Sequence, residues 1–279
     1  MQPLSPIIRR LYLALFMVLF AAMLPAVIFY ADGWRYKAGF GFVRTGGIYI
    51  GVPYAEANVQ VNGEHIGRSG FLDRSFYLGD LAPATYTVRV EREGYRPWTR
   101  QLIVEEQLVT DTRALLLPIE VKPVRLFVAT SSASQSTEAM RIVSRATITE
   151  YAALFAATST ASSTIPVDEQ EGIGLFLEKG VLIARWIQEN SFPPSQFCQQ
   201  PSSCVDSIVI ENTQRVVDAH LFRGGVVYVT EGGEVHFIEA DVRPSPLHLL
   251  FFEAPKAQIQ IIDDTLVIKS GAEYYEISL

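Results

Sequence analysis

The feature that most constrains this chain is an uncharged run of twenty residues near the N-terminus, from Leu11 to Tyr30. At a rise of about 1.5 Å per residue, a helix of this length covers about 30 Å, the thickness of the hydrocarbon core of a bilayer. Pro25 bends such a helix without preventing the span, and Tyr30 and Trp34 stand where an interfacial aromatic belt is expected. The run predicts a transmembrane helix over residues 11–30.

A cleaved signal peptide is the alternative explanation of this run. The apolar region of a signal peptide is shorter, and small residues occupy positions −3 and −1 of its cleavage site. Cleavage after Ala22 would place Phe20 at position −3. Cleavage after Ala26 would place Leu24 there, so neither site fits the rule. We favour an uncleaved anchor, and the signal peptide stays open as the alternative.

The charges on either side of the span bear on its orientation. Two arginines precede it, and Arg35, Lys37 and Arg44 follow it, so the positive-inside bias is nearly balanced. The short tail of residues 1–10 favours an N-terminus inside the cell. We therefore expect a single-pass protein of the cell membrane with its bulk outside the cytoplasm.

The overall composition limits the possible partners. The formal net charge is −7 and 49% of the residues are hydrophobic, so the chain can bury a substantial core. Phosphate binding requires clustered Lys and Arg, which the acidic balance does not supply. We expect no nucleic-acid partner.

Cys198 and Cys204 are the two cysteines of the chain. No histidine lies near them, so the spacing typical of a zinc site is absent. In an oxidising compartment they would form a disulfide bond, whereas in the cytosol they would be two free thiols. Together with the expected outside location, the pair predicts a disulfide that closes a polar loop.

After the span, residues 31–47 form a Gly- and aromatic-rich connector, and then short strands begin. The dipeptide Asn62-Gly63 is a strong hairpin signal, because both residues tolerate positive φ. About six strands in about seventy residues predict a small antiparallel sandwich with one face of each sheet buried. The candidate strands lie at Ile48–Val52, Val59–Val61, Phe76–Leu78, Tyr86–Val90, Leu102–Val104 and Leu115–Leu117.

Three segments, in this order, resemble a PEGA domain: Val59–Gly67, Leu81–Val90 and Glu93–Trp98. They match its Val-x-Val-Asn-Gly hairpin, its Leu-x-Pro-Gly-x-Tyr strand entry and its Gly-Tyr turn. The sequence departs from the family at Ala84, where the strand entry has Gly, and in place of the Pro-Glu-Gly-Ala motif it has the segment around Pro53. The resemblance covers about residues 48–118.

The residues that carry the resemblance are turn formers and expected core residues: Asn62, Gly63, Gly67, Pro83, Tyr86, Gly94, Tyr95 and Trp98. PEGA domains resemble small surface β-sandwiches of extracytoplasmic proteins, generally without activity of their own. The resemblance thus implies attachment or display. It identifies no catalytic residue.

Residues 119–170 are rich in Ala, Ser and Thr, especially at 129–137 and 156–164. Such tracts bury little apolar area, so we interpret the stretch as a linker or insertion. Between the tracts, Glu138–Phe155 is compatible with a short helix or a strand pair.

Short strands resume in residues 171–279, with a weak internal repeat. The segment Gly224–Ile238 aligns with Asp263–Ile277, and Lys179–Trp186 is a possible third copy. Units of about 40 residues that alternate strands and tight turns resemble propeller blades. Because propellers need at least about four blades, the region predicts an incomplete, propeller-like array with open edges that favour self-association.

A search for catalytic motifs gives no pair of nucleophile and base. His65, His220, His236 and His248 are scattered, and each is expected to be an ordinary surface or strand-face residue. Asp263-Asp264, Asp241 and Glu239 lack the spacing of a calcium loop, and we interpret Asp263-Asp264 as a turn. We also expect His65, Ser69 and Asp73 to be replaceable with little effect on stability. We expect no cofactor and no metal.

The sequence therefore favours a non-enzymatic, membrane-anchored cell-surface protein that binds envelope glycans or surface proteins. A glycan hydrolase or lyase in the C-terminal β domain is one alternative, and a membrane sensor or assembly subunit is another. The predicted segments are a tail (1–10), a transmembrane helix (11–30), a connector (31–47), a PEGA-like sandwich (48–118), a linker (119–170) and a blade-like β domain (171–279).

Overall fold

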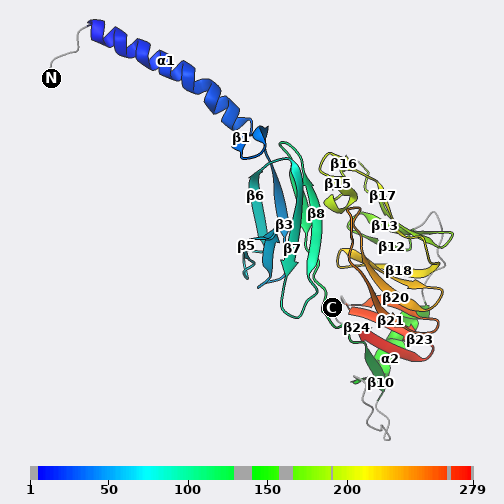
Figure 1. The fold of residues 1–279 in the computed structure, drawn as a ribbon. Helices are drawn as coiled ribbons and strands as arrows, with labels where there is room; N and C mark the ends of the chain where they lie inside the picture. Colours follow the sequence, from blue (N-terminus) through cyan, green and yellow to red (C-terminus); the bar gives the residue numbers. More distant parts are fainter. Residues whose placement is uncertain (1–5, 129–139, 157–165, 190, 263–264, 278–279) are drawn as a thin grey trace.

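The computed structural model describes residues 6–128, 140–156, 166–189, 191–262 and 265–277. In these residues, one long helix precedes two β domains (Figure 1). We call the domains the sandwich, residues 46–113, and the C-terminal domain, residues 124–277. The predicted fold class, mainly β with an N-terminal apolar helix, is confirmed.

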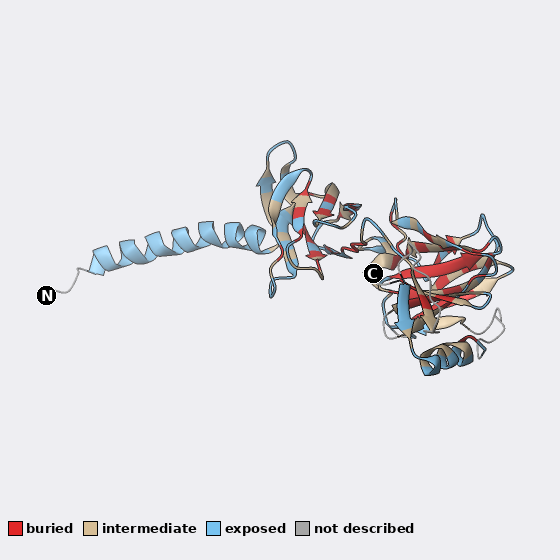
Figure 2. Cartoon of the chain, turned by 90° about the horizontal axis from the view of Figure 1, so that it is seen from below, coloured by how far each residue is buried: buried red, intermediate tan, exposed pale blue. Residues whose placement is uncertain are grey.

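Helix α1 spans Pro6–Ala31, which is 26 residues, and none of them is buried. It extends away from both domains as a separate rod (Figures 1 and 2). The helix is long and apolar enough to cross a membrane. It begins at Pro6, so the segment predicted as a tail over residues 1–10 is helical from Pro6 onward. The apolar Ile7 and Ile8 continue the helical segment past the two arginines.

The predicted connector contains a two-stranded antiparallel hairpin, formed by β1 (Trp34–Lys37) and β2 (Gly41–Arg44). Its turn uses Gly39 and Gly41, both with positive φ (86° and 77°). The hairpin lies between the end of α1 and the sandwich (Figure 1).

The sandwich is built from two sheets. The three-stranded sheet has the order β6 (Ser75–Leu81), β3 (Gly46–Gly51), β9 (Val109–Arg113). The four-stranded sheet has the order β5 (Glu64–Arg68), β4 (Asn58–Val61), β7 (Ala84–Glu91), β8 (Trp98–Val104). Alternating apolar residues such as Ile48, Ile50 and Val59 are fully buried between them, as the period of two predicts.

Two expectations for this domain are wrong. The sandwich is not wholly antiparallel, because β9 pairs with β3 in parallel. The chain enters β9 from the opposite sheet, after β8, and so runs in the same direction as β3. The candidate strand Leu115–Leu117 is an extended segment outside the sheets. All three leucines are buried, since the segment passes between the two domains.

The C-terminal domain contains three larger open sheets and one two-stranded sheet in the described residues. The first has the order β12 (Asp168–Gln170), β13 (Ile173–Glu178), β14 (Val181–Trp186), β17 (Ser207–Glu211). The second has the order β18 (Val216–Phe222), β19 (Gly225–Thr230), β20 (Glu234–Glu239), β21 (His248–Glu253). The third has the order β22 (Gln258–Ile262), β23 (Thr265–Ser270), β24 (Glu273–Ile277), β10 (Val124–Val128), β11 (Met140–Val143).

The internal repeat corresponds to equivalent turns in successive sheets. Lys179-Gly180 joins β13 to β14, and Arg223-Gly224 joins β18 to β19, with positive φ at all four residues. The corresponding Asp263-Asp264 lies outside the described residues. The described parts of the three sheets form neither a closed barrel nor a closed propeller.

Part of the predicted linker belongs to the C-terminal domain. Strands β10 and β11 extend the third sheet beyond β24, and α2 (Arg145–Ala156) packs on that sheet. Phe155 of α2 is buried with Leu126 and Tyr274, which anchors the helix. Strand β11 and helix α2 lie in the segment Glu138–Phe155, for which the sequence was compatible with either a short helix or a strand pair. Most of the two Ala/Ser/Thr tracts falls outside the described residues.

Candidate functional site

The sandwich and the C-terminal domain share one apolar core. A single cluster of buried residues includes Leu102 and Leu116 on one side and Phe237, Phe251 and Ile259 on the other. Buried positions continue through both domains in Figure 2. Burial of this kind is the dominant favourable term in association, so the two domains form one body.

Arg100, on β8 of the sandwich, is the central polar residue of this interface. It is only 1% exposed, and its guanidinium forms an ion pair with Glu239 at the end of β20. It also donates a hydrogen bond to the carbonyl of Pro244 at 3.0 Å. The indole of Trp98 donates to the other oxygen of Glu239, also at 3.0 Å. Two neighbouring core-facing residues of one strand thus hold the same carboxylate.

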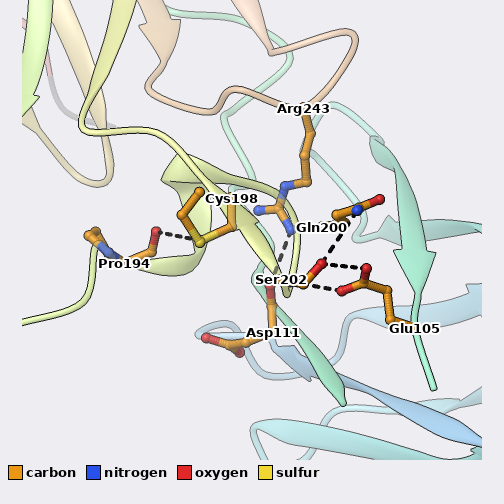
Figure 3. The surroundings of a disulfide bond; sticks show 8 residues. Glu105, Asp111, Pro194, Cys198, Gln200, Ser202 and Arg243 are labelled. Carbon is orange, nitrogen blue, oxygen red and sulfur yellow. Dashed lines mark hydrogen bonds between the residues drawn. A yellow bond between two sulfur atoms is a disulfide. The ribbon is translucent and has the colours of Figure 1, made fainter. Parts of the chain in front are cut away.

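A second buried ion pair lies beside the first. Arg243 donates to both carboxylate oxygens of Asp241, at 2.8 and 2.7 Å. The same guanidinium donates to the backbone carbonyl of Asp111 on β9 at 3.1 Å (Figure 3). Asp241 also lies 3.8 Å from the Nε atom of Arg100. That nitrogen, unlike the other two of the guanidinium, has no hydrogen-bond partner among the described residues. Four charged side chains therefore compensate each other inside the interface.

The disulfide loop forms the third contact between the domains. Cys198 and Cys204 are bonded to each other, and they pair across β15 (Cys198–Gln200) and β16 (Ser203–Cys204). The loop follows the short 3-10 helix η1 (Ser195–Phe197). At its tip, Ser202 donates two hydrogen bonds to Glu105 of the sandwich, 2.7 Å from its backbone nitrogen and 2.6 Å from its hydroxyl (Figure 3). The disulfide restrains a loop that contacts the neighbouring domain.

A cleft of about 430 Å³ opens at this junction. The sandwich contributes Tyr54 and Arg113 to it, and the C-terminal domain contributes Glu171, Gln196 and Arg223. Burial raises the pKa of the Tyr54 hydroxyl, so this group stays a neutral hydrogen-bond donor at physiological pH. The lining offers donors, acceptors and one aromatic face, which suits a polar ligand with many hydroxyl groups.

The cleft also brings Glu239 and Asp241 to one wall, and paired carboxylates are the machinery of glycoside hydrolysis. Their oxygens, however, are already engaged. Glu239 accepts from Trp98 and Arg100 and from the backbone of Leu247. Asp241 accepts from Arg243. These contacts hold both carboxylates in place at the interface between the domains.

A second polar cluster joins the first two sheets of the C-terminal domain. The hydroxyl of Tyr228 donates to Glu211 at 2.9 Å and lies 3.0 Å from Nε2 of His248. The ring of His236 stacks on Tyr228, with centroids 5.2 Å apart. Burial alone would raise the pKa of Glu211, but hydrogen bonds from Thr213 and Tyr228 outweigh it and lower the pKa to about 2. Burial, together with Glu211, raises the pKa of Tyr228.

A third cluster lies where the first strands of the three sheets approach each other. His220 of β18 is flanked by Asp168 of β12, at 3.6 Å, and by Asp218, at 3.7 Å. Burial alone would lower the pKa of His220, but the two carboxylates outweigh it and raise the pKa above its ordinary value. Asp218 also accepts from the backbone of Ile259 on β22 at 3.1 Å. The imidazole and the Asp218 carboxylate together therefore link elements from all three sheets.

The histidines are less scattered in space than in sequence. His236 and His248 meet at Tyr228, with ring centroids 5.2 Å apart, and His220 lies between carboxylates. His65 is exposed on the sandwich, as expected. No group of three His, Cys, Asp or Glu side chains in the described residues is arranged to hold a metal ion.

The turn residues of the predicted family motif occupy turns. Asn62 and Gly63 have φ values of 51° and 82°, and they connect the paired residues Val61 and Glu64. Gly94 also has a positive φ of 80°. These are backbone conformations that favour Asn and Gly.

The other residues of the predicted family motif differ in how deeply they are buried. Tyr86 and Tyr95 are half-buried, and the hydroxyl of Tyr86 donates to the carbonyl of Ala82 next to Pro83 at 3.0 Å. Gly67 lies against the ring of Phe76, where a Cβ would be only 2.8 Å away. Trp98, expected in the core of the sandwich, is buried at the interface with the C-terminal domain.

Ser69 is more deeply buried than the sequence predicts. It was expected to be replaceable, but it is 2% exposed and its hydroxyl donates to the carbonyl of Tyr54 at 2.6 Å. The hydroxyl also accepts from the backbone of Ala57 at 2.9 Å. It closes the turn that leads into β4.

Comparison with known proteins gives a match for one part of the chain. No curated protein matches the chain. The family model of the PEGA domain matches residues 45–116, which confirms the resemblance carried by the hairpin and strand-entry motifs. The match ends before the C-terminal domain begins, and the sandwich is the part of the chain that resembles PEGA domains.

Proposed function

We propose that this protein is a non-enzymatic, membrane-anchored module outside the cytoplasm that presents its C-terminal domain for binding to envelope glycans or surface proteins. The observation that carries the proposal is the buried pair of Arg100 and Glu239 within a shared core. It makes the PEGA-like sandwich a rigid support for the C-terminal domain, with the apolar helix α1 at the opposite end.

The cleft between the domains is the binding site that the geometry supports best. It is formed by both domains, so a ligand there depends on their fixed arrangement. The exposed Arg113 and Glu171 supply charged hydrogen-bonding groups at opposite walls, and Tyr54 supplies an aromatic face. A glycan, which combines apolar ring faces with many hydroxyl groups, fits this lining better than an apolar ligand does.

Binding of the full-length protein, reconstituted into liposomes, to isolated envelope glycan tests this proposal. The variants Arg113→Ala and Glu171→Ala remove exposed cleft residues, and we expect each to weaken binding at least about tenfold, the equivalent of about 1.4 kcal/mol. Arg145→Ala and Glu150→Ala remove the same residue types from the exposed surface of α2 and should leave binding unchanged.

The same liposomes distinguish binding from hydrolysis or lyase activity, which remains the competing function because Glu239 and Asp241 share the cleft wall. We expect the glycan to be recovered at its original chain length after prolonged incubation. If the native protein shortened the glycan and the Asp241→Asn variant did not, the protein would be an enzyme. Equal binding by the cleft variants and the α2 variants would move the binding surface elsewhere.

A further inference from the structure

The hairpin of β1 and β2 has two chemically different faces. Residues on alternate positions of a strand share a face, and the cross-strand pairs place Tyr36 opposite Phe42 and Trp34 opposite Arg44. Trp34, Tyr36, Phe42 and Arg44 therefore lie on one face, where Arg44 is paired with Asp32. Arg35 and Lys37 lie on the other. One face of the hairpin is thus mainly aromatic, and the other carries two basic residues.

The aromatic face is uncovered by the rest of the chain that the structure describes. Tyr36 is 70% exposed and Phe42 is 74% exposed, and their rings contact each other edge to face at 5.4 Å. Phe40, at the turn, is 58% exposed. Three neighbouring exposed aromatic side chains are a patch of the kind that marks an interaction site.

The patch adjoins the apolar helix. The hairpin begins three residues after α1 ends at Ala31, and the ring of Trp34 lies 6.2 Å from that of Phe29 in the last turn of the helix. The guanidinium of Arg35 lies 3.7 Å above the ring of Tyr30. The aromatic face is thus continuous with the surface of α1.

The hairpin is also fixed to the sandwich. Asp32, between the helix and the hairpin, accepts a hydrogen bond from Arg44 at 2.6 Å and from Gln107 of the sandwich at 3.2 Å. Arg35 pairs with Asp80 of the sandwich at 3.1 Å. The hairpin cannot turn away from the sandwich without breaking these contacts.

We propose that the β1–β2 hairpin is a membrane-interface anchor, whose aromatic face enters the headgroup region of a phospholipid bilayer around the end of α1. Tyr and Trp are enriched at that depth because one part of the ring is apolar and the other is polar. The ammonium group of Lys37 suits the phosphate groups of the lipids. The inference rests on the proposed membrane anchoring by α1.

The anchor would determine how the sandwich stands on the membrane. A single helix leaves the domain that follows it free to swivel, whereas a helix and a hairpin together provide two points of attachment. Because Asp32 and Arg35 join the hairpin to the sandwich, the attachment extends to the sandwich and, through Arg100 and Glu239, to the C-terminal domain.

Spin labels at single introduced cysteines test this arrangement in the full-length protein, since both native cysteines are bonded to each other. We would label Phe42→Cys in the hairpin and Leu19→Cys in the middle of α1. Phe71→Cys is the matched control, because it is an equally exposed phenylalanine (79%) at the far end of the sandwich. The protein is reconstituted into liposomes of phosphatidylcholine and phosphatidylglycerol.

Power saturation with oxygen and with a water-soluble nickel chelate then reports the depth of each label. We expect oxygen to dominate at Leu19→Cys and at Phe42→Cys, with the greater depth at Leu19→Cys, and nickel to dominate at Phe71→Cys. A deep label at Leu19→Cys with nickel dominating at Phe42→Cys would overturn the hairpin anchor and leave the proposed membrane helix intact. Nickel dominating at Leu19→Cys would overturn both.

Discussion

The guanidinium of Arg100 and the carboxylate of Glu239 form a buried ion pair between residues 139 positions apart in the chain. Both side chains are almost wholly buried. Removing one partner from such a pair leaves an uncompensated charge in a medium of low polarity. The stability of the whole two-domain unit therefore depends on this contact.

Replacing Arg100 with Met should lower the free energy of unfolding by about 3–5 kcal/mol, because Glu239 is left buried without its partner. Urea unfolding of the purified protein measures this change. The double variant Arg100→Met, Glu239→Met should recover most of the loss. Arg89→Ala removes a half-exposed ion pair with Glu91 and should cost less than about 1 kcal/mol. Similar losses for Arg100→Met and Arg89→Ala would show that the buried pair has no special role.

The sequence contains a signal for this pair that local motifs do not reveal. Trp98, Arg100, Leu102 and Val104 alternate along β8 and share its buried face. Glu239 occupies the equivalent buried face of β20, after Val235 and Phe237. A charge at a core-facing strand position requires a partner, but nothing in one strand identifies a partner 139 residues away.

The turns and strands of the sandwich could be predicted because their causes are local. Asn62 and Gly63 both adopt positive φ, as an Asn-Gly pair in a two-residue hairpin turn is expected to do. The run Leu115–Leu117 does not form the predicted strand. A short apolar run has the same sequence pattern in a strand and in a buried connector, so the sequence cannot distinguish them. The sequence does not predict strand β10, because its antiparallel partner β24 is far along the chain, and β11 then pairs with β10.

The disulfide should be present in protein isolated from membranes, and its loss should weaken the contact between the domains. A loop of this length gains about 2 kcal/mol from the restraint that the bond places on the unfolded chain. The double variant Cys198→Ser, Cys204→Ser should therefore unfold at lower urea. It should also expose the loop to proteolysis, because Ser202 no longer holds Glu105 as firmly. Mass spectrometry that finds both thiols free in the isolated protein would contradict this prediction and the outside location.

His220 should make stability depend on pH. The pKa of His220 is raised in the folded protein, so its contribution is fully present below the ordinary value of 6.5 and is lost as pH rises through the folded pKa. The groups that face the imidazole are the carboxylates of Asp168 and Asp218, which favour its charged form.

The stability difference between the native protein and His220→Gln should thus shrink as the pH rises above 6.5 and through the raised pKa of the folded protein. Parallel urea titrations across this range measure it. His65→Gln, on an exposed strand, is the control and should give no such trend. A difference that grows with pH would mean that burial dominates and that the imidazole is neutral in the folded protein.

Ser69→Ala should destabilise the sandwich by about 1–2 kcal/mol, because the backbone groups of Tyr54 and Ala57 lose a buried hydrogen-bond partner. Thermal unfolding checks this change against Asp73→Ala, an exposed substitution in the neighbouring loop that should have little effect. Ser69→Thr retains the hydroxyl but adds a methyl group, so its effect reports how tightly the turn is packed. Equal melting temperatures for Ser69→Ala and Asp73→Ala would contradict the structural role of the hydroxyl.

The accessibility of single introduced cysteines in intact spheroplasts tests most directly whether α1 anchors the two domains outside the cytoplasm. Phe71→Cys, on the sandwich, and Ile7→Cys, at the start of α1, are both exposed in the folded chain. A membrane-impermeant maleimide should label Phe71→Cys in intact spheroplasts and should label Ile7→Cys only after lysis. Protection of Phe71→Cys until lysis would contradict the account.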